Sequence, residues 1–254
     1  SGRKMVYFIG VGPGDPELLT IKGKKIIDSA DVIIYAGSLV NREVLKDIKS
    51  GAKVYNSATM HLEEVIEVMK EAEKKNLMTA RVHTGDPAIF GAHREQMDAL
   101  EREGIEFCVI PGVSSFVAAA AALKKEYTLP EVTQSIILTR MEGRTPMPEK
   151  ESIEAFAKHQ ATMVIFLSAN RIEELVEQLQ TSYPVDTPIA LVYKASWPEE
   201  KMIQGNLGNI VELVRKANIT KTGLIVVGRF LGDQYALSKL YDKHFSHEYR
   251  EAKS

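Results

Sequence analysis

Residues 5–23 of the chain read Met5-Val6-Tyr7-Phe8-Ile9-Gly10-Val11-Gly12-Pro13-Gly14-Asp15-Pro16-Glu17-Leu18-Leu19-Thr20-Ile21-Lys22-Gly23. An apolar run leads into glycines spaced two apart, then into Asp-Pro and a helical apolar pattern. This order predicts a strand, a tight loop and a helix. Because glycine has no side chain, the loop is suited to close approach by another backbone or by a ligand.

The same stretch matches the dinucleotide-binding fingerprint only in part. That fingerprint places glycines at relative positions one, three and six. Gly10 and Gly12 fit, whereas the sixth position holds Asp15 and two prolines stiffen the turn. The acidic residue that would bind a ribose is also missing, because Ala-Gly follows the predicted strand at 32–35. We therefore do not predict a dinucleotide site.

The bulk composition is that of a soluble globular protein. The chain has 254 residues, is 44% hydrophobic and 26% charged, and carries a net charge of -2. This length suits one large or two medium domains, and the charge gives no electrostatic case for a nucleic-acid partner. No apolar stretch approaches the ~20 residues of a membrane span, and the first residues lack a signal-peptide pattern. We expect a cytoplasmic protein that binds neither nucleic acid nor membrane.

The single cysteine, Cys108, can build neither a disulfide framework nor a thiolate metal site. We expect it to be a buried strand residue in a reducing compartment. The sequence also lacks the His-x-x-Glu-His and paired-carboxylate spacings of metal sites, so no metal bound by the protein is expected.

Strands and helices alternate through the first half of the chain, which predicts an α/β domain with a largely parallel sheet. We place this domain at residues 1–123. In such sheets, ligands bind in the loops at the carboxyl ends of the strands. The predicted strands are 5–10, 32–35, 53–55, 78–82 and 106–110, the predicted helices are 17–29, 42–49, 62–69 and 91–102, and an alanine-rich segment spans 114–123.

The periodicity breaks at a charged and proline-containing stretch, which we interpret as a linker at residues 124–133. A second α/β domain is predicted at residues 134–254. Its strands are expected at 135–140, 162–167, 188–193, 201–206 and 223–227, and its helices at 149–158, 172–179 and 210–216. Periodicity is weak from Tyr235 onward, and residues 248–254 are expected to fray.

Glycine and proline gather directly after three predicted strands of the first domain. The stretches are Gly10–Pro16, Arg81–Gly91 and Pro111–Ser115. Gly and Pro fix the path of the backbone where a ligand or a second backbone comes close. A single Gly-Asp-Pro is more often a simple turn. Together, at one edge of a sheet, the three loops outline a pocket rimmed by backbone amides and carbonyls.

These three loops also carry a family resemblance. Gly-x-Gly-Pro-Gly-Asp with Leu-Leu-Thr, Gly-Asp-Pro-x-x-Phe-Gly and Pro-Gly-Val-Ser-Ser, in this order and spacing, resemble the motifs of the tetrapyrrole methyltransferases. The resemblance runs from Met5 to about Gly232. It implies two α/β domains with an active-site cleft between them, the cofactor S-adenosyl-L-methionine with S-adenosyl-L-homocysteine as product, and a homodimer.

Three further segments are similar to the branch that methylates C-11 of precorrin-4 or cobalt-precorrin-4 on the route to cobalamin. They are Tyr35–Val40, Arg140–Glu149 and Tyr193–Glu200. The resemblance thus implies a C-methyltransferase acting on a small tetrapyrrole, whose cobalt would belong to the substrate. The uroporphyrinogen-methylating branch has an Asp, assigned as proton acceptor, where this chain has Ala36. This departure argues against uroporphyrinogen III and leaves the catalytic residue unassigned.

The family's cofactor contacts carry over position by position. The implied cofactor-binding residues are Pro13, Thr84, Gly85, Asp86, Ile89, Ser114, Ser115, Leu167 and Ala195. For the substrate we single out Gly12, Gly14, Asp15, Arg140 and Arg144. Guanidinium groups pair bidentately with carboxylates, of which a precorrin has many, although loop charges of this kind are often merely solvated.

Two histidines and the only tryptophan receive no catalytic assignment. His83 and His93 lie in or beside the second loop, where a lone histidine is more often a hydrogen-bonding residue. Trp197 is expected to pack in a core, although a loop tryptophan could also cover a macrocycle face or a dimer contact.

Two other functions fit the sequence as read. One is a methyltransferase of the same fold that acts on another precorrin position or on a macromolecule, either ribosomal RNA or a modified protein histidine. The other is a nucleotide-binding regulatory module of two α/β halves. The near-neutral charge and the Arg140–Glu149 loop favour the small acidic substrate.

Overall fold

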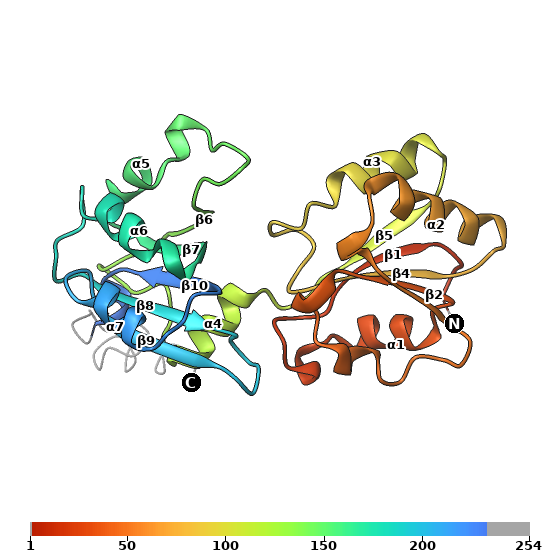
Figure 1. Cartoon of the computed structure of the whole chain (residues 1–254), viewed down its shortest axis with the longest axis horizontal. Helices are drawn as coiled ribbons and strands as arrows, with labels where there is room; N and C mark the ends of the chain where they lie inside the picture. The colour runs from red at the N-terminus through yellow and green to blue at the C-terminus, as the bar shows by residue number, and fades with distance from the viewer. Residues whose placement is uncertain (1, 233–254) are drawn as a thin grey trace, which may run out of the picture. The chain divides into compact units, whose positions relative to one another are not determined.

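The chain forms two compact units in a computed structural model that describes residues 2–232 (Figure 1). The first unit comprises Ser1–Ala118 and Ala195–Pro198, and the second comprises Ala119–Lys194 and Glu199–Ser254. No sequence pattern indicated that four residues from late in the chain would join the first unit. The predicted domain boundaries at 1–123 and 134–254, with a linker at 124–133, stay a prediction. The tail from Tyr235 onward lies outside the described residues.

The first unit contains a five-stranded sheet in the order β3-β2-β4-β1-β5, with every neighbouring pair parallel. The predicted parallel sheet is therefore confirmed. Strands β1 and β2 are apolar along their whole length, and β4, although it contains Thr79, Arg81 and His83, is buried at four of its five positions, as expected for strands covered on both faces. The strands are β1 (Val6–Gly10), β2 (Val32–Tyr35), β3 (Lys53–Asn56), β4 (Thr79–His83) and β5 (Phe107–Ile110).

Helices cover both faces of this sheet, because alternate strand residues point to opposite sides. On one face Ile9 packs with Ile27 of α1 (Ile21–Ser29), and the 3₁₀ helix Arg42–Leu45 lies on the same face. On the other face Phe8 joins the cluster that holds α2 (Leu62–Lys74) and α3 (Arg94–Arg102). Figure 1 shows α1 on one side of the strands and α2 and α3 on the other.

The predicted helix at residues 17–29 is wrong at its start. Asp15 accepts a hydrogen bond from the Glu17 amide and caps a short 3₁₀ turn, Pro16–Leu18. Thr20 then accepts from the Gly23 amide, and α1 begins only after this second cap. Asp and Thr are both strong N-cap residues, so the local sequence offers two helix starts within six residues.

The arrangement places the loops after β1 and β4 at a topological switch point. These two strands are neighbours, yet α1 follows β1 on one face and α3 follows β4 on the other. In open parallel sheets, ligands bind at the carboxyl ends of strands where the connections diverge in this way. The loop after β5 lies beside them, because β5 pairs with the other edge of β1.

The second unit is also an α/β layer structure, but its sheet is mixed. The strand order is β6-β7-β10-β8-β9, in which only β6 and β7 are parallel. The predicted strands at 188–193 and 201–206 are confirmed as β8 and β9, which pair in antiparallel register. The elements are β6 (Ile136–Arg140), β7 (Thr162–Ser168), β8 (Pro188–Tyr193), β9 (Lys201–Asn206), β10 (Thr222–Val227), α5 (Ile153–Ala157), α6 (Ile172–Leu179) and α7 (Ile210–Lys216), while α4 (Ser115–Leu123) crosses the boundary between the units.

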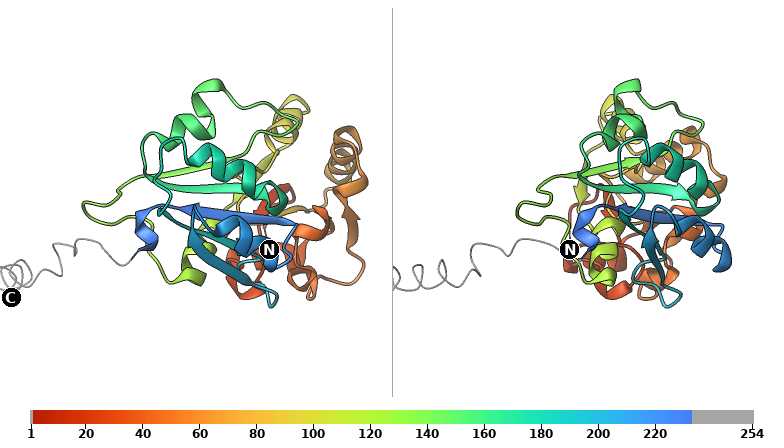
Figure 2. Two further views of the ribbon diagram at one scale, coloured as in Figure 1. Left: turned by 60° about the vertical axis from the view of Figure 1, so that its left-hand side comes forward. Right: turned by 90° about the vertical axis from the view of Figure 1, so that its left-hand side faces the viewer.

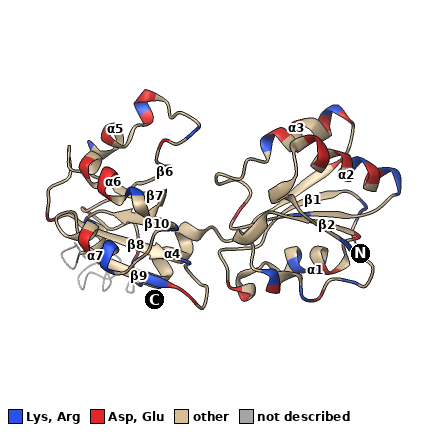
Figure 3. Ribbon diagram, viewed as in Figure 1, with Lys and Arg blue, Asp and Glu red and all other residues tan. Residues whose placement is uncertain are grey.

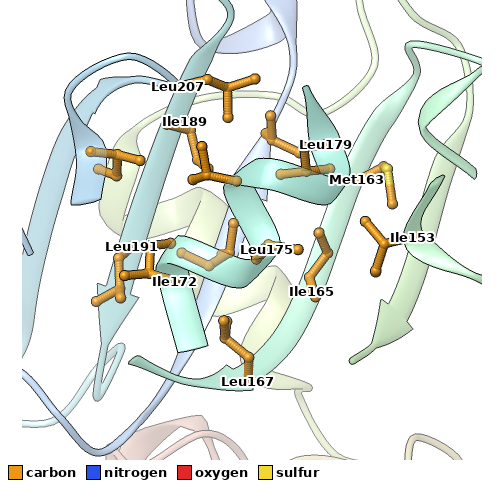
Figure 4. Packing of buried hydrophobic residues seen from close by; sticks show 14 of the residues in the cluster. Ile153, Met163, Ile165, Leu167, Ile172, Leu175, Leu179, Ile189, Leu191 and Leu207 are labelled. Atoms are coloured by element: carbon orange, nitrogen blue, oxygen red, sulfur yellow. The ribbon is translucent and has the colours of Figure 1, made fainter. Parts of the chain in front are cut away.

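The core of the second unit lies between its sheet and helices α5, α6 and α7. Figure 4 shows Leu175 and Leu179 of α6 facing Ile165 of β7 and Ile189 of β8. Both views of Figure 2 keep α5 and α6, in green and teal, on the same side of the strands. Full burial of such a side chain contributes about 1.5–3 kcal/mol, so the predicted apolar stripe accounts for this packing.

Charged residues lie mainly away from the cores. Figure 3 shows Lys, Arg, Asp and Glu on the outer turns of α2 and α3. Within residues 2–232, no helix has the length and apolarity to cross a membrane.

Candidate functional site

The loops after β1, β4 and β5 meet through their backbones at glycines. Gly85 N–H donates to the Gly12 carbonyl at 2.7 Å, and Gly12 N–H donates to the Gly85 carbonyl at 3.2 Å. A Cβ on Gly10 would lie 2.6 Å from the Gly85 oxygen and 2.8 Å from the Gly112 nitrogen. A Cβ on Gly112 would likewise overlap the backbones of Gly10 and Gly85. The close approach predicted for the first loop is therefore made by two other backbones.

Asp86 ties the second loop to the third. Its Oδ1 accepts from the Ala88 amide at 2.7 Å, and its Oδ2 accepts from the Gly112 amide at 2.8 Å. Both distances are those of charge-assisted hydrogen bonds. Both carboxylate oxygens of Asp86 thus hold loop backbone and set the shape of the two loops. The contact with the cofactor that the resemblance implies for Asp86 stays a prediction.

The first loop is also held by the segment Ala195–Pro198, the β8–β9 connection that belongs to the first unit. Trp197 Nε1–H donates to the Pro13 carbonyl at 2.7 Å, and the Asp15 amide donates to Ser196 Oγ at 3.0 Å. The expectation that Trp197 fills a core is wrong, since the half-buried ring lies on a loop and belongs to none of the hydrophobic clusters. Ala195, predicted to contact the cofactor, is buried at this place.

Hydroxyl groups complete this edge of the sheet. Ser114 is buried and Ser115 begins α4, and neither hydroxyl makes a hydrogen bond to a described residue. A Cβ on Gly85 would lie 3.6 Å from the Ser114 Cα, so the second and third loops are adjacent here. Thr84 follows β4, and its Oγ1 lies 3.5 Å from the Gly12 carbonyl, at the limit of a hydrogen bond. Ile89 is half-buried in the turn after Asp86.

The first unit thus brings together most of the residues that the sequence singled out. They are Gly12, Pro13, Gly14, Asp15, Thr84, Gly85, Asp86, Ile89, Ser114, Ser115 and Ala195. The remaining three, Arg140, Arg144 and Leu167, belong to the second unit.

The two arginines of the second unit differ in what they already bind. Arg140 ends β6, and its guanidinium donates to the carbonyls of Met141 and Thr145, each at 3.3 Å. It therefore shapes the loop in which it lies. Arg144 is exposed and makes no hydrogen bond or ion pair with any described residue, so its guanidinium is available for a carboxylate. Leu167 is buried near the end of β7.

Sequence reasoning missed a buried basic cluster beneath the second loop. Arg81 is 6% exposed, and its Nε donates to Gln96 Oε1 at 3.1 Å. Burial lowers the pKa of Arg81 to about 10, so it remains cationic at neutral pH. The ring of His83 lies edge-on to that of His93, with centroids 4.6 Å apart. In the sequence, Arg81 was a charge within a predicted strand, and His83 and His93 were seen only as residues in or beside the second loop.

His93 does not play the hydrogen-bonding role expected for a histidine near this loop. Its ring is 3% exposed, and neither ring nitrogen has a hydrogen-bond partner among the described residues. Burial, with smaller contributions from His83 and Arg81, lowers the pKa of His93 to about 3. Burial also lowers the pKa of His83. Both rings are therefore neutral packing groups near pH 7.

The residues at this edge fit S-adenosylmethionine. They supply peptide groups and the unpaired hydroxyls of Ser114 and Ser115, which match the hydroxyl, amino and carboxylate groups of that molecule. The Asp86 carboxylate, which would otherwise be an unpaired charge, is satisfied by two amides. Within residues 2–232, no group of three or more His, Cys, Asp or Glu side chains is placed to hold a metal ion.

Comparison with known proteins agrees with this geometry. The sequence profile of the Tetrapyrrole (Corrin/Porphyrin) Methylases matches residues 5–211. The cobalt-precorrin-4 C(11)-methyltransferase of Methanocaldococcus jannaschii is 55% identical over 254 residues, covering 99% of this chain and 98% of the relative. The precorrin-4 C(11)-methyltransferase of Pseudomonas aeruginosa is 44% identical, covering 96% and 98%.

Solved structures show the same relationship. The X-ray structure of a cobalt precorrin-4 methyltransferase of cobalamin biosynthesis has 44% identity and a TM-score of 0.87, covering 90% of this chain and 96% of that one. A uroporphyrin-III C-methyl transferase from Thermus thermophilus, complexed with S-adenosyl homocysteine, has 26% identity and a TM-score of 0.73, covering 90% and 93%. This chain belongs to the tetrapyrrole (corrin/porphyrin) methylase family.

Proposed function

We propose that this chain transfers the methyl group of S-adenosylmethionine to C-11 of cobalt-precorrin-4, or of its metal-free counterpart precorrin-4. The observation that carries the proposal is the 55% identity, over 99% of this chain, to an enzyme named for that reaction. The absence of an acidic residue after Tyr35 supports a substrate other than uroporphyrinogen III, because Ala36 and Gly37 occupy that place. The proposed product of the cofactor is S-adenosylhomocysteine.

The protein's main task in this reaction is alignment. S-adenosylmethionine supplies a methyl group on a sulfonium centre, which is already activated for transfer to an electron-rich carbon. The loops after β1, β4 and β5 are fixed by glycine contacts and by Asp86 before any ligand binds. Holding two reactants in the correct geometry can lower a barrier by about 7–11 kcal/mol. No general base is assigned to this chain.

The residues divide between the two ligands in the proposal. For the cofactor we propose Thr84, Gly85, Ile89 and the hydroxyls of Ser114 and Ser115, together with Pro13, Asp86, Leu167 and Ala195. For the tetrapyrrole we propose Gly12, Gly14, Asp15 and Arg144, with Arg140 holding the loop that carries Arg144. A guanidinium that has no other partner can pair bidentately with a propionate or acetate side chain of the macrocycle.

A substitution at Gly85 tests the cofactor site. Gly85 has φ of +64°, and an added Cβ would lie 3.6 Å from the Ser114 Cα and 3.8 Å from the Ser115 nitrogen, so a bulky side chain would enter the space between the second and third loops. Gly85→Val should abolish binding of S-adenosylhomocysteine in calorimetric titration, while circular dichroism confirms that the variant is folded. Undiminished affinity in a folded variant would overturn the assignment of this loop to the cofactor.

We further infer a homodimer in the cytoplasm, as the family resemblance implies. Light scattering after gel filtration measures the mass in solution, and a monomer at micromolar concentration would contradict the dimer. Cell fractionation tests the location.

A further inference from the structure

Four consecutive residues of the first loop are each held by another part of the first unit. Gly12 exchanges backbone hydrogen bonds with Gly85. Trp197 Nε1–H donates to the Pro13 carbonyl at 2.7 Å, and Asn41 Nδ2–H donates to the Gly14 carbonyl at 2.9 Å. The Asp15 amide donates to Ser196 Oγ at 3.0 Å. These hydrogen bonds use the N–H groups of Gly12 and Asp15 and one lone pair of each carbonyl, and they fix the path of the loop backbone.

Gly14 is glycine because of Trp197. Its φ does not lie in the left-handed region, so backbone conformation does not require glycine here. An added Cβ would instead overlap Cδ1 and Nε1 of the indole and would lie 2.7 Å from Cγ. Real Cβ atoms do not approach other atoms this closely. Gly14 and Trp197 therefore form a matched pair, in which the glycine provides the space that the indole fills.

The segment that carries the indole is held in an unfavourable backbone conformation. Lys194 has φ of +50° and Ser196 has φ of +75°, both in the left-handed region that residues other than glycine rarely adopt. Such residues persist where the surrounding contacts over-determine them, and they cluster at functional sites. The contacts that hold this segment include the hydrogen bonds of Ser196 and Trp197 to the first loop.

We propose that Trp197 is a positioning residue of the methyl-transfer site, which together with Ser196 fixes the Pro13–Asp15 backbone in the conformation that receives the tetrapyrrole. This inference rests on the proposed function, because it assigns Gly12, Gly14 and Asp15 of the first loop to the macrocycle. Trp197 acts through the loop and is not assigned a contact with the reacting atoms. Since Trp197 is the only tryptophan in the chain, its emission also reports directly on this loop.

The first test removes the indole N–H while keeping an aromatic ring. Trp197→Phe should raise the KM for cobalt-precorrin-4 by about three- to tenfold, as expected for one lost hydrogen bond. The Kd for S-adenosylhomocysteine should rise less than the KM, because Pro13 is the one residue assigned to the cofactor that Trp197 is shown to hold, whereas the neighbouring Gly14 and Asp15 are assigned to the tetrapyrrole. A Trp197→Phe enzyme that is less stable but has an unchanged KM would show a purely structural role and overturn the proposal.

The second test uses the matched pair. Gly14→Ala should expel the indole into water, which shifts the tryptophan emission to longer wavelength, and should raise the KM for the tetrapyrrole. In the double variant Gly14→Ala/Trp197→Ala the clash is absent, so the KM should equal that of Trp197→Ala alone. Gly223→Ala is the control, because its Cβ would meet atoms no closer than 3.5 Å. The proposal is overturned if Gly14→Ala raises the KM by the same factor in the Trp197→Ala variant as in the wild-type protein.

The two proposals fail differently. If the wild-type protein transfers no methyl group to either form of precorrin-4, the proposed function is wrong. The positioning role is then judged from equilibrium binding of cobalt-precorrin-4, followed by quenching of the Trp197 emission. If Trp197→Phe and Gly14→Ala bind cobalt-precorrin-4 with the wild-type Kd, the positioning role is contradicted. It is also contradicted if the wild-type protein does not bind cobalt-precorrin-4.

Discussion

The bridge made by Asp86 gives the most quantitative test of how the loops are held. Its two carboxylate oxygens accept from the amides of Ala88 and Gly112 at 2.7 and 2.8 Å. Asp86→Asn replaces one oxygen by an NH₂ group, which must then face a backbone N–H donor whichever way the amide turns. One hydrogen bond is lost, and the other changes from charge-assisted to neutral.

The expected cost follows from these two changes. Hydrogen bonds to charged groups contribute about 1.5–3 kcal/mol each, and a neutral one contributes about 0.5–1.5 kcal/mol. The free energy of unfolding should therefore fall by about 2–5 kcal/mol. Because Asp86 is partly exposed, we expect a value in the lower half of this range, about 2–3 kcal/mol. Because the loops after β4 and β5 are no longer tied, S-adenosylhomocysteine should also bind more weakly.

Urea unfolding measures the first effect and calorimetric titration the second. Asp98→Asn is the matched control, because within residues 2–232 the Asp98 carboxylate pairs only with the exposed Arg94 one turn away. Exposed pairs of this kind contribute about 0.3–0.5 kcal/mol. The reasoning is refuted if Asp86→Asn unfolds at the wild-type urea concentration, or if Asp98→Asn costs as much as Asp86→Asn.

Three other substitutions test separate parts of the account. Gly10→Ala should destabilise the protein by about 1–3 kcal/mol in urea unfolding, because its Cβ would lie 2.6 Å from the Gly85 oxygen, whereas Gly223→Ala should not. His93 has a native pKa of about 3 against an ordinary value of 6.5, so the unfolded chain binds more protons between these values. The free energy of unfolding should therefore fall as the pH drops from 6.5 towards 3, and this group contributes up to about 1.4 kcal/mol per pH unit to the slope. His93→Phe should remove that contribution. If the slope is the same in His93→Phe, the ring is not buried in its neutral form. Arg144→Ala should weaken binding of cobalt-precorrin-4 more than binding of S-adenosylhomocysteine, and the reverse order would count against its assignment to the substrate.

The sequence did not predict the order of the strands in either sheet, but each predicted strand lies within one residue of its bounds in the structure. Strong alternation of apolar runs and amphipathic stretches explains this, as with α6, whose stripe at Ile172, Leu175, Val176 and Leu179 is fully buried. Helix starts were less predictable. Asp15 and Thr20 each provide a cap, and propensity alone does not show that both are used.

The sequence motifs identified the candidate site residues, whereas the contacts of their side chains depend on the folded structure. Asp86 and Arg140 look like ligand-binding residues in the sequence, but their side chains hold backbone groups of the loops. The contact between Trp197 and Gly14 joins positions that are 183 residues apart, and no local sequence pattern predicts it. The buried rings of His83 and His93 were also unpredictable, because only tertiary packing removes them from water.

The central claim is methyl transfer to C-11 of the macrocycle. The most direct measurement incubates the wild-type protein with cobalt-precorrin-4 or precorrin-4 and S-adenosylmethionine carrying an isotopically labelled methyl group, then locates the label in the product by nuclear magnetic resonance. The account predicts one labelled methyl group at C-11 and stoichiometric S-adenosylhomocysteine. A label at another carbon, or no transfer to either macrocycle by the folded protein, would contradict it.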